Sequence, residues 1–387
     1  MTVAIVAVLW AAVIAYLLAR VVAQGRVYRT ASLAVGLPQE ASSVMIVVPA
    51  RDEIANIADC LASLVAQRGL PGRCDIVVVD DGSADGTAET AAAIAAAQPG
   101  MRLLRAGALP PGWMGKPHAC WRGAKTGDSE WLCFIDADLR AEPLLVASAV
   151  AAAETRGIDM LSVSPFHDLG SFWERLILPA GMLLIAGAMD LRRVGDPGAG
   201  EVAAAGQFLL FRRAAYRAIG GHAAVRGEIC EDKALARLTK NAGLRYRLLA
   251  GEDLARTRLY RDLPSLWEGL AKNAVEILGS SAASVVAATA GLAAACLAVA
   301  LPLWAAAAAI ADPSAARLAG LALCAAASLI AVGLHLGTLA HCRVRLAYGL
   351  LFPAAYGAAA ALAWSSLAAR RAGRVRWKGR TYDLAAR

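Results

Sequence analysis

The stretch WLCFIDADLRAEP (131–143) starts with five apolar residues and then presents two carboxylates, Asp136 and Asp138, with one alanine between them. A continuous apolar run of this length is typical of a strand buried on both faces of a parallel sheet. A carboxylate at the end of such a strand must stay hydrated, paired or metal-bound, because burying a bare charge is costly. The stretch therefore predicts a core strand with an acidic pair at its carboxyl end.

Two interpretations of this acidic pair remain open from the residues alone. Carboxylates two positions apart on a strand can point the same way, and Mg²⁺ typically takes one or two protein carboxylates and completes its shell with water and substrate phosphates. The alternative is a solvated turn, because an Asp-x-Asp pattern by itself is weak evidence.

The surrounding sequence repeats the same strand-then-helix rhythm. Further strands are predicted at 44–50, 75–81 and 101–106, and helices at 54–67, 85–97 and 114–125. This alternation predicts right-handed βαβ units and a mostly parallel sheet. Ligands of such sheets bind outside the carboxyl ends of the strands. Here those ends carry Arg51–Glu53, Asp80–Asp81 and Asp136–Asp138, which predicts one acidic rim.

The sequence lacks the characteristic motifs of two common classes of nucleotide-binding protein. The first predicted strand is followed by PARDE (49–53) and not by the GxGxxG of dinucleotide-binding folds. The stretch GWMGKPH (112–118) is not a P-loop, because Pro117 follows Lys116 where Ser or Thr is needed. From the sequence alone, Lys116 could either contact a phosphate group or be an ordinary surface lysine.

A second pair of carboxylates, Glu231-Asp232, begins the predicted helix EDKALARLTKNAG (231–243). Acidic residues in a first helical turn commonly stabilise the helix dipole. Placed after a glycine-containing loop, one of the two could instead reach a reaction centre as a general base. Both interpretations remain open at this point.

Four stretches without charged residues predict a membrane protein: 1–19, 277–311, 318–340 and 346–369. A helix needs roughly 20 apolar residues to cross a bilayer. We therefore expect a transmembrane helix at 1–24, a soluble domain at 40–275, membrane helices at 277–369 and a basic tail at 370–387. The apolar segment 172–189 contains Glu174, Arg175 and Pro179 and fits an interfacial segment better than a span.

The positive-inside rule gives a partly conflicting topology. Arg20, Arg26 and Arg29 follow the first apolar run, which places Met1 outside and the soluble domain in the cytoplasm and disfavours a cleaved signal peptide. Three C-terminal crossings would then leave the basic tail outside, against the same rule. Either one segment does not fully cross or the count is wrong, and part of 277–311, expected at 277–285, should lie at the interface or inside the soluble domain.

The net charge of +8 comes largely from the basic tail. A basic run beside a membrane helix favours contact with anionic lipid head groups. Without an aromatic-studded basic surface, no nucleic-acid partner is expected. The eight cysteines show no CxxC spacing, so neither zinc nor disulfide bonds are predicted.

Taken together, the motifs resemble those of the family 2 glycosyltransferases of GT-A fold. The matching stretches are VVPARDEIANI (47–57), VVVDDGSADGT (77–87), GWMGKPHA (112–119), FIDADLRAEP (134–143), AAAGQFLLFRR (203–213) and EICEDKALARLTKNAG (228–243). TRLYRDLPSLWEGLAKN (257–273), the membrane helices and WKGRTYDL (377–384) make the chain look most like the hopene-associated glycosyltransferases of bacterial hopanoid clusters. Similar enzymes glycosylate carotenoid acids.

The resemblance implies a role for each matching position. Glu53 and Asp81 would hold the nucleoside, and Lys116 would lie near the phosphates or the sugar. Asp136 and Asp138 would meet the diphosphate through a divalent metal, Mg²⁺ or Mn²⁺, with Asp138 the stronger ligand candidate. Asp232 would be the catalytic base. The acceptor side would include Gln207, Glu231, Arg258 and Trp267.

The implied fold is an α/β GT-A domain with one N-terminal and about three C-terminal transmembrane helices. The implied reaction is an inverting, metal-dependent transfer of one hexose from a nucleotide-diphosphate sugar to a hopanoid-like or carotenoid-like lipid, on the cytoplasmic side of a bacterial inner membrane. TRLYRD (257–262) stands where processive members have QxxRW, which favours a single transfer.

Two alternatives remain. The acceptor could be a polyprenyl phosphate, which would scarcely need a base. The chain could also be a membrane scaffold or translocator with a degenerate transferase domain. The complete acidic set counts against the second alternative. So does the scarcity of ionisable residues in the apolar runs, where we find His335.

Overall fold

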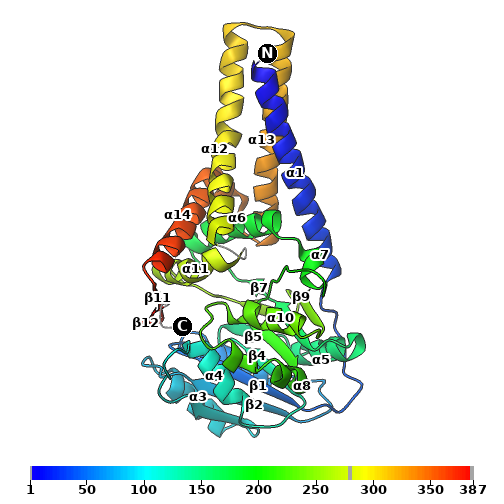
Figure 1. Ribbon diagram of the computed structural model, residues 1–387, viewed down its shortest axis with the longest axis vertical. Helices are drawn as coiled ribbons and strands as arrows, with labels where there is room; N and C mark the ends of the chain where they lie inside the picture. Colours follow the sequence, from blue (N-terminus) through cyan, green and yellow to red (C-terminus); the bar gives the residue numbers. More distant parts are fainter. Residues whose placement is uncertain (1, 278–280, 384–387) are drawn as a thin grey trace. The chain divides into compact units, whose positions relative to one another are not determined.

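The computed structural model describes residues 2–277 and 281–383, which fall into two compact units (Figure 1). The sheet unit comprises Tyr28–Asp168, Leu191–Leu259 and Gly373–Arg387, and the helical unit comprises Met1–Val27, Leu169–Asp190 and Tyr260–Ala372. The predictions that concern Met1, Arg387 and the positions 278–280 of the expected interfacial stretch lie outside the described residues.

A seven-stranded sheet organises the sheet unit, in the order β3-β2-β1-β4-β8-β6-β9. Its strands are β1 (Val44–Ala50), β2 (Cys74–Asp80), β3 (Met101–Arg105), β4 (Trp131–Ile135), β6 (Met160–Ser164), β8 (Phe208–Arg212) and β9 (Tyr246–Ala250). The four strands predicted from the sequence are all present and mutually parallel. β8 runs antiparallel to both of its neighbours, β4 and β6, so the sheet is mixed.

Helices cover both faces of this sheet, as the continuous apolar runs predict. Successive side chains of β1 point to opposite faces. Val44, Ile46 and Val48 enter a core with α2 (Ile57–Val65), α3 (Thr87–Ala96) and α5 (Leu145–Arg156). Met45 and Val47 enter a second core with α4 (Gly115–Ala124) and α10 (Glu231–Asn241). The short helices of the same unit are α7 (Leu191–Val194), α8 (Arg213–Ala218) and α9 (Gly221–Ala224).

The register of the parallel strands brings their carboxyl ends to one edge. Ala50 at the end of β1 pairs with Asp80 at the end of β2, and β4 follows on the other side of β1. A small sheet continues from this edge, with β5 (Leu139–Ala141), β10 (Ala255–Thr257) and β7 (Phe166–His167) in the order β5-β10-β7. The acidic rim predicted from the sequence is therefore formed, with Asp136–Asp138 between β4 and β5.

Long apolar helices make up most of the helical unit. Besides α1 (Thr2–Thr30), it contains α6 (Phe172–Ala188), α11 (Leu263–Ile277), α12 (Ser281–Ala311), α13 (Ala315–His341), the 3₁₀ turn η1 (Leu346–Leu351) and α14 (Phe352–Arg371). Four of the described helical segments are long and apolar enough to cross a membrane: Thr2–Thr30, Ser281–Ala311, Ala315–His341 and Leu346–Arg371. This confirms the predicted one N-terminal and three C-terminal candidates.

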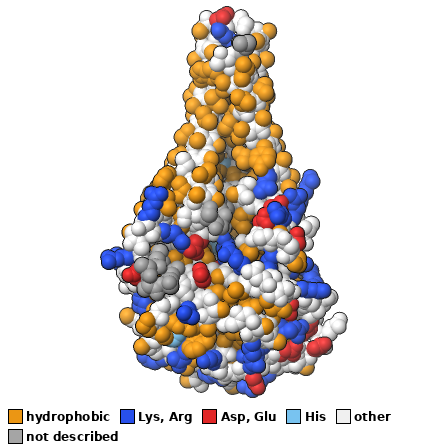
Figure 2. Space-filling model, viewed as in Figure 1, with side chains coloured by type: hydrophobic (Ala, Val, Ile, Leu, Met, Phe, Trp, Pro, Cys, Tyr) orange, Lys and Arg blue, Asp and Glu red, His pale blue; other side chains and the backbone are white. Residues whose placement is uncertain are grey.

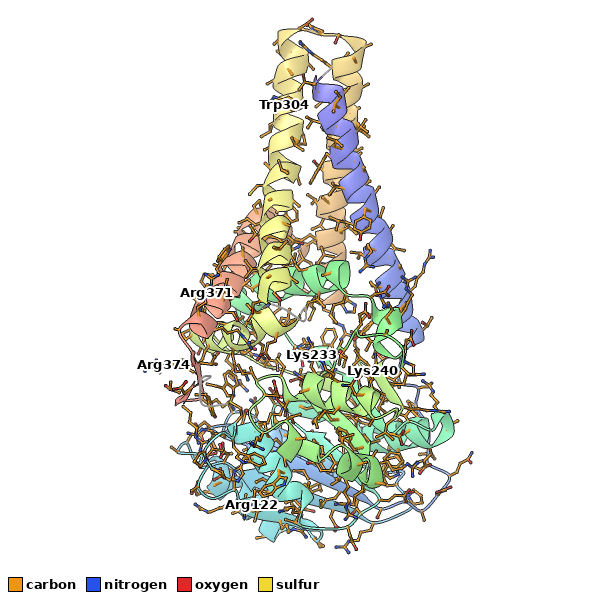
Figure 3. The ribbon with its side chains drawn as sticks, viewed as in Figure 1. Arg122, Lys233, Lys240, Trp304, Arg371 and Arg374 are labelled. Atoms are coloured by element: carbon orange, nitrogen blue, oxygen red, sulfur yellow. The ribbon has the colours of Figure 1, made fainter. Side chains whose placement is uncertain are left out.

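The surface of these helices has the composition expected of lipid-facing helices. Figure 2 shows hydrophobic side chains covering α12 and its neighbours on the side in view. Trp304 projects from α12 (Figure 3), and 40% of its surface is exposed. α6 is shorter, with Pro179 inside it and a capping box at its start formed by Ser171 and Glu174. Its predicted interfacial position stays a prediction.

The described residues of the C-terminal tail form a β-hairpin within the sheet unit. β11 (Arg374–Trp377) and β12 (Arg380–Asp383) are antiparallel, with Trp377 opposite Arg380. The two residues between the strands, Lys378 and Gly379, both have positive φ, 46° and 73°. A two-residue hairpin loop of this kind matches the twist of the strands. The charge pattern of the tail does not predict this hairpin.

Candidate active site

A tight turn after β4 presents the acidic pair. The backbone N–H of Asp136 donates to the carbonyl of Gln207 at 3.0 Å, and the N–H of Leu139 donates to the carbonyl of Asp136 at 3.0 Å. Burial, followed by the charges of Asp136 and Glu53, raises the pKa of Asp138 to about 8. Its Oδ1 atom is buried without a hydrogen-bond partner among the described residues. A cation bound beside Asp138 would therefore stabilise its ionised form.

Lys116 supplies one cation to this rim from the first turn of α4. Its Nζ lies 2.8 Å from either carboxylate oxygen of Asp136 and 2.9 Å from Oε1 of Glu231. Burial alone would lower the pKa of Lys116, but Asp136 and Glu231 raise it well above its usual value. The sequence alone leaves open whether Lys116 is a surface lysine, and the structure places it inside the acidic cluster.

Asp232 joins the same cluster from the start of α10. Its Oδ1 accepts from the backbone N–H of Lys233 at 2.8 Å. A Cβ at Gly206 would lie 3.1 Å from Oδ2 of Asp232 and 3.3 Å from Nζ of Lys116, so the glycine leaves room where the two groups converge. Burial and the charge of Glu231 raise the pKa of Asp232 to about 6, against the opposing effect of Lys116. A carboxylate of this kind is ionised at neutral pH and still basic enough to accept a proton.

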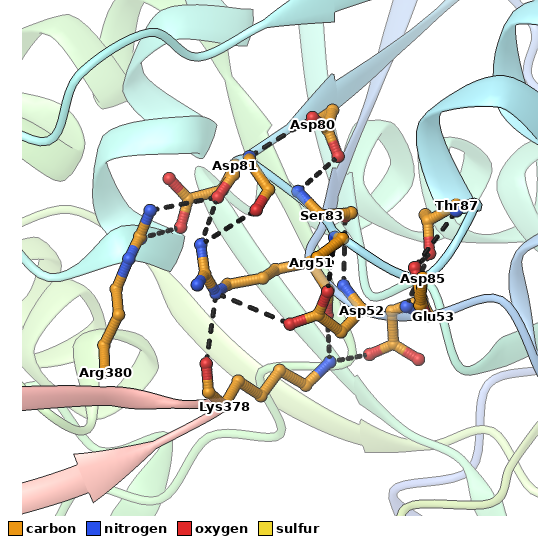
Figure 4. Close-up of polar contacts among 12 residues, drawn as sticks. Arg51, Asp52, Glu53, Asp80, Asp81, Ser83, Asp85, Thr87, Lys378 and Arg380 are labelled. Carbon is orange, nitrogen blue, oxygen red and sulfur yellow. Dashed lines mark hydrogen bonds and ion pairs between the residues drawn. The ribbon is translucent and has the colours of Figure 1, made fainter.

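The carboxylates after β1 and β2 lie on the same rim and are paired differently. Asp81 is 4% exposed, and its Oδ2 pairs with Arg380 of β12. The Oε2 of Glu53 accepts from Nδ2 of Asn56 at 2.8 Å, while its Oε1 pairs with Lys378 (Figure 4). The sequence predicts both carboxylates as site residues but neither Lys378 nor Arg380. A run of basic residues does not indicate which distant carboxylates it will contact.

The residues predicted for the acceptor side are not all in this cluster. Glu231 contacts Lys116, and Gln207 accepts from Asp136 through its backbone carbonyl. Arg258 follows β10 in the sheet unit, and Trp267 lies on α11 in the helical unit.

The acidic pair fits the divalent metal that the resemblance implies. The unpartnered Oδ1 of Asp138 is an available oxygen ligand, and the raised pKa of Asp138 shows that a nearby cation would stabilise its charge. Among the described residues, no group of three or more His, Cys, Asp and Glu side chains is arranged to hold a metal unaided. Two carboxylates with substrate phosphates as the remaining ligands are the usual arrangement for Mg²⁺.

Comparison with known proteins identifies the domain that carries this rim. Residues 45–220 match the model of glycosyl transferase family 2. These residues form a family 2 glycosyltransferase domain. The match covers β1 to β4, the acidic pair and Lys116, and it confirms the family predicted for this domain.

Curated relatives and a solved structure extend the comparison. The 4,4'-diaponeurosporenoate glycosyltransferase of Staphylococcus aureus is 29% identical over 236 residues, 60% of this chain and 60% of the relative. Its homologue from another strain is 28% identical over 251 residues, 64% of each chain. The chain thus covers less than two thirds of the length of these relatives.

The solved structure of a mannosyltransferase from Pyrobaculum calidifontis, in complex with GDP-Man and Mn²⁺, aligns with a TM-score of 0.56 and 18% identity. The alignment covers 95% of this chain and 99% of that one. At this identity it shows a shared fold, which confirms the predicted GT-A domain.

Proposed function

We propose that this protein is a membrane-bound glycosyltransferase that moves one hexose from a nucleotide-diphosphate sugar to a lipid hydroxyl, with inversion at the anomeric carbon. The observation that carries the proposal is the convergence of Lys116, Asp136 and Asp232 at the carboxyl edge of a family 2 domain. That edge is where α/β sheets bind their ligands.

The rim residues divide between donor binding and catalysis. Asp81 and Glu53 bind the nucleoside, and Asp136 and Asp138 hold a divalent metal, Mg²⁺ or Mn²⁺. When bound, the metal supplies positive charge that stabilises the diphosphate leaving group. Lys116 lies within reach of the same anionic group and adds a fixed positive charge beside it.

Asp232 accepts the proton of the acceptor hydroxyl as its oxygen attacks the anomeric carbon. The pKa of about 6 suits this task, because the group is ionised at neutral pH. Glu231 holds Lys116 at 2.9 Å and keeps that cation beside the base. A polyprenyl phosphate acceptor is already ionised and scarcely needs a base, so the raised pKa of Asp232 favours a hydroxyl acceptor.

The acceptor we propose is a hopanoid-like or carotenoid-like lipid. Four apolar helices support a substrate taken from the bilayer. The Staphylococcus aureus relatives are named for a carotenoid acid, which supports an apolar lipid acceptor. A carboxylate is already ionised at neutral pH, so the proposal of a hydroxyl acceptor rests on Asp232 and not on these relatives. We place the sheet unit on the cytoplasmic side of a bacterial inner membrane, because Arg20, Arg26 and Arg29 follow the first apolar run.

The hairpin contacts bear on the topology conflict noted above. Lys378 and Arg380 contact Glu53 and Asp81 within the sheet unit, so the tail lies on the same side of the membrane as the sheet. An even number of crossings must then separate 275 from 373. One of the three C-terminal apolar helices therefore does not fully cross, which satisfies the positive-inside rule.

The proposal is tested with the purified full-length protein in lipid nanodiscs. Labelled UDP-glucose and GDP-mannose are supplied with Mn²⁺ and one of three acceptors: a hopanoid polyol, a carotenoid acid or a polyprenyl phosphate. We expect label in a hydroxyl-bearing lipid with inverted anomeric configuration by NMR. Label found only in the carotenoid acid or only in the polyprenyl phosphate would replace the proposed hydroxyl acceptor. A protein that neither binds nor hydrolyses any nucleotide sugar would be a scaffold.

A further inference from the structure

The C-terminal hairpin is docked on the two loops that carry the donor and base residues. Val375 of β11 is 4% exposed and packs with Met114 and Ile229 in a small apolar cluster. Met114 stands two positions before Lys116, and Ile229 stands two positions before Glu231. The docking of β11 therefore places the turn of the hairpin beside the rim.

Two cations of the hairpin reach the two carboxylates proposed to bind the nucleoside (Figure 4). Arg380 pairs through Nη1 with Oδ2 of Asp81, and its Nη2 donates to the backbone carbonyl of Asp81 at 3.0 Å. Lys378 pairs through Nζ with Oε1 of Glu53 and donates to the carbonyl of Arg51 at 2.6 Å. Arg51 in turn donates from Nε to the carbonyl of Lys378 at 3.2 Å.

The turn of the hairpin has the backbone that a two-residue loop requires, with positive φ at Lys378 (46°) and at Gly379 (73°). The side chain of Lys378 is 23% exposed, and its ammonium lies against Glu53.

The pairing of Asp81 with Arg380 leaves one oxygen of the carboxylate without a hydrogen bond. Asp81 is almost fully buried, and a buried carboxylate without a cation is strongly destabilising. Arg380 occupies Oδ2, while Oδ1 has no hydrogen-bond partner among the described residues. An acceptor oxygen held in this way suits an N–H or O–H group of a base or ribose.

We propose that the hairpin is a wall of the nucleotide-sugar site, in which Arg380 and Lys378 are positioning residues that orient Asp81 and Glu53 toward the nucleoside. This inference rests on the proposed function, because it requires that a nucleotide binds at this rim. It assigns to β11 and β12 a part in recognising the donor.

The test measures binding of UDP, GDP and TDP with Mn²⁺ by calorimetry on the full-length protein, continuing with the nucleotide that the wild type binds most tightly. Arg380→Gln and Lys378→Gln should each weaken binding at least about tenfold, since each removes a hydrogen bond between charged groups. In turnover assays the donor KM should rise by more than kcat falls. Arg380→Lys, which keeps the charge, should restore part of the affinity.

Arg376→Gln is the matched control. Arg376 is an exposed cation on the same hairpin, and its loss should leave nucleotide binding unchanged. Thermal unfolding of each variant shows whether the protein is folded. A double-mutant cycle tests action through Asp81: adding Arg380→Gln to Asp81→Asn should cost little beyond Asp81→Asn alone.

Three outcomes would overturn the inference. Unchanged binding in folded Arg380→Gln and Lys378→Gln would show that the hairpin is not part of the site. Tighter binding would show that the hairpin blocks the site. Fully additive costs in the cycle would show that Arg380 does not act through Asp81. A wild-type protein that binds none of the three nucleotides would instead overturn the proposed function itself.

Discussion

The Nζ of Lys116 lies 2.8 Å from the carboxylate of Asp136, which joins the first turn of α4 to the end of β4. Lys116 also contacts Glu231 at 2.9 Å, so a single cation serves two carboxylates. In the proposed function Asp136 would hold a divalent metal, which would leave the ammonium of Lys116 to contact a phosphate oxygen, a common role for lysine. Without a ligand, the ammonium offsets part of the negative charge of the two carboxylates.

Replacing Lys116 should impair both donor binding and transfer. In Lys116→Gln, Asp136 and Glu231 lose their shared partner, and the diphosphate loses a positive charge. Since a charged hydrogen bond contributes about 1.5–3 kcal/mol, we expect kcat/KM for the donor to fall roughly 10- to 100-fold. Lys125→Gln, at the exposed end of the same helix, is the control and should keep wild-type kinetics. Equal kinetics in both variants would contradict the role of Lys116.

Asp138 should be required for metal-dependent nucleotide binding. Asp138→Asn keeps the size of the side chain but removes the charge of the available ligand oxygen. We expect Mn²⁺-dependent binding of the nucleoside diphosphate to weaken by at least about tenfold. In the wild type, chelation by EDTA should abolish transfer, and added Mn²⁺ or Mg²⁺ should restore it.

Asp75→Asn is the matched control for this variant. Asp75 is also a buried aspartate of the sheet, but it lies near the start of β2 and pairs with Arg73 at 2.8 Å. Its replacement should leave Mn²⁺-dependent binding intact. If Asp138→Asn binds the nucleotide with wild-type affinity and the same metal dependence, the metal assignment is wrong.

The sequence is sufficient for the parts of the fold that depend on local pattern. β1 and β4 are unbroken apolar runs, and because parallel strands share a carboxyl edge, the sequence alone predicts Asp81, Asp136 and Asp138 along one rim, as the strand pairing confirms. The antiparallel strand β8 does not follow from the strand–helix rhythm, although its sequence, FLLFR, is a similar apolar run. Nothing local to that run specifies its direction, which depends on pairing with β4 and β6.

The contacts of the C-terminal hairpin could not be predicted from the sequence. Asp81 and Arg380 are 299 positions apart, and the sequence predicts Asp81 on the acidic rim but Arg380 in a tail that contacts lipid head groups. Their pairing depends on the hairpin docking through Val375, a contact between segments with no shared local pattern. The raised pKa of Asp232 likewise depends on its burial and on the charge of Glu231. Neither the depth of burial nor the distance between the two groups follows from the sequence.

Asp232→Asn should abolish most transfer while sparing the donor site. General-base assistance is typically worth ~10²–10⁴-fold, so we expect kcat to fall by this amount. Calorimetry with the nucleoside diphosphate and Mn²⁺ should give nearly wild-type affinity, which separates a catalytic role from misfolding. Wild-type turnover in a folded Asp232→Asn protein would exclude this residue as the base.

The pH dependence of the wild type provides an independent check. The pKa of Asp232 is raised from 3.8 to about 6, and the base must be deprotonated to act. The kcat/KM for the acceptor should therefore fall as pH drops through about 6 and level off above it. The residual activity of Asp232→Asn should lack this acid limb. An identical limb in the variant would assign the titration to another group.

The hairpin contacts predict the side of the membrane on which the chain ends. Green fluorescent protein fused after residue 387 should be fluorescent, and alkaline phosphatase fused there should be inactive, because the tail contacts the sheet unit, which we propose to be cytoplasmic. Alkaline phosphatase fused after Asp312, between α12 and α13, should be active. An active phosphatase at the end of the full chain would be incompatible with the ion pair between Lys378 and Glu53.

Gly115 should contribute to nucleotide binding because Asp81 and Arg380 lie directly against it. A Cβ at this position would overlap Oδ2 of Asp81 and lie 2.8 Å from Nη1 of Arg380. Gly115→Ala would therefore push the carboxylate or the hairpin away, although alanine is otherwise the better helix former. We expect affinity for the nucleoside diphosphate to drop roughly tenfold, similar to the loss of one charged hydrogen bond.

Gly200→Ala is the control for this substitution, because a Cβ at Gly200 would meet no atom within 4 Å. Combining Gly115→Ala with Arg380→Gln tests whether the loss of nucleotide affinity arises at the Asp81–Arg380 pair. If the added methyl group acts by disturbing the Asp81–Arg380 pair, the double variant should bind the nucleotide about as well as the weaker single variant. Wild-type affinity in Gly115→Ala would mean that Asp81 and Arg380 can separate without cost to donor binding.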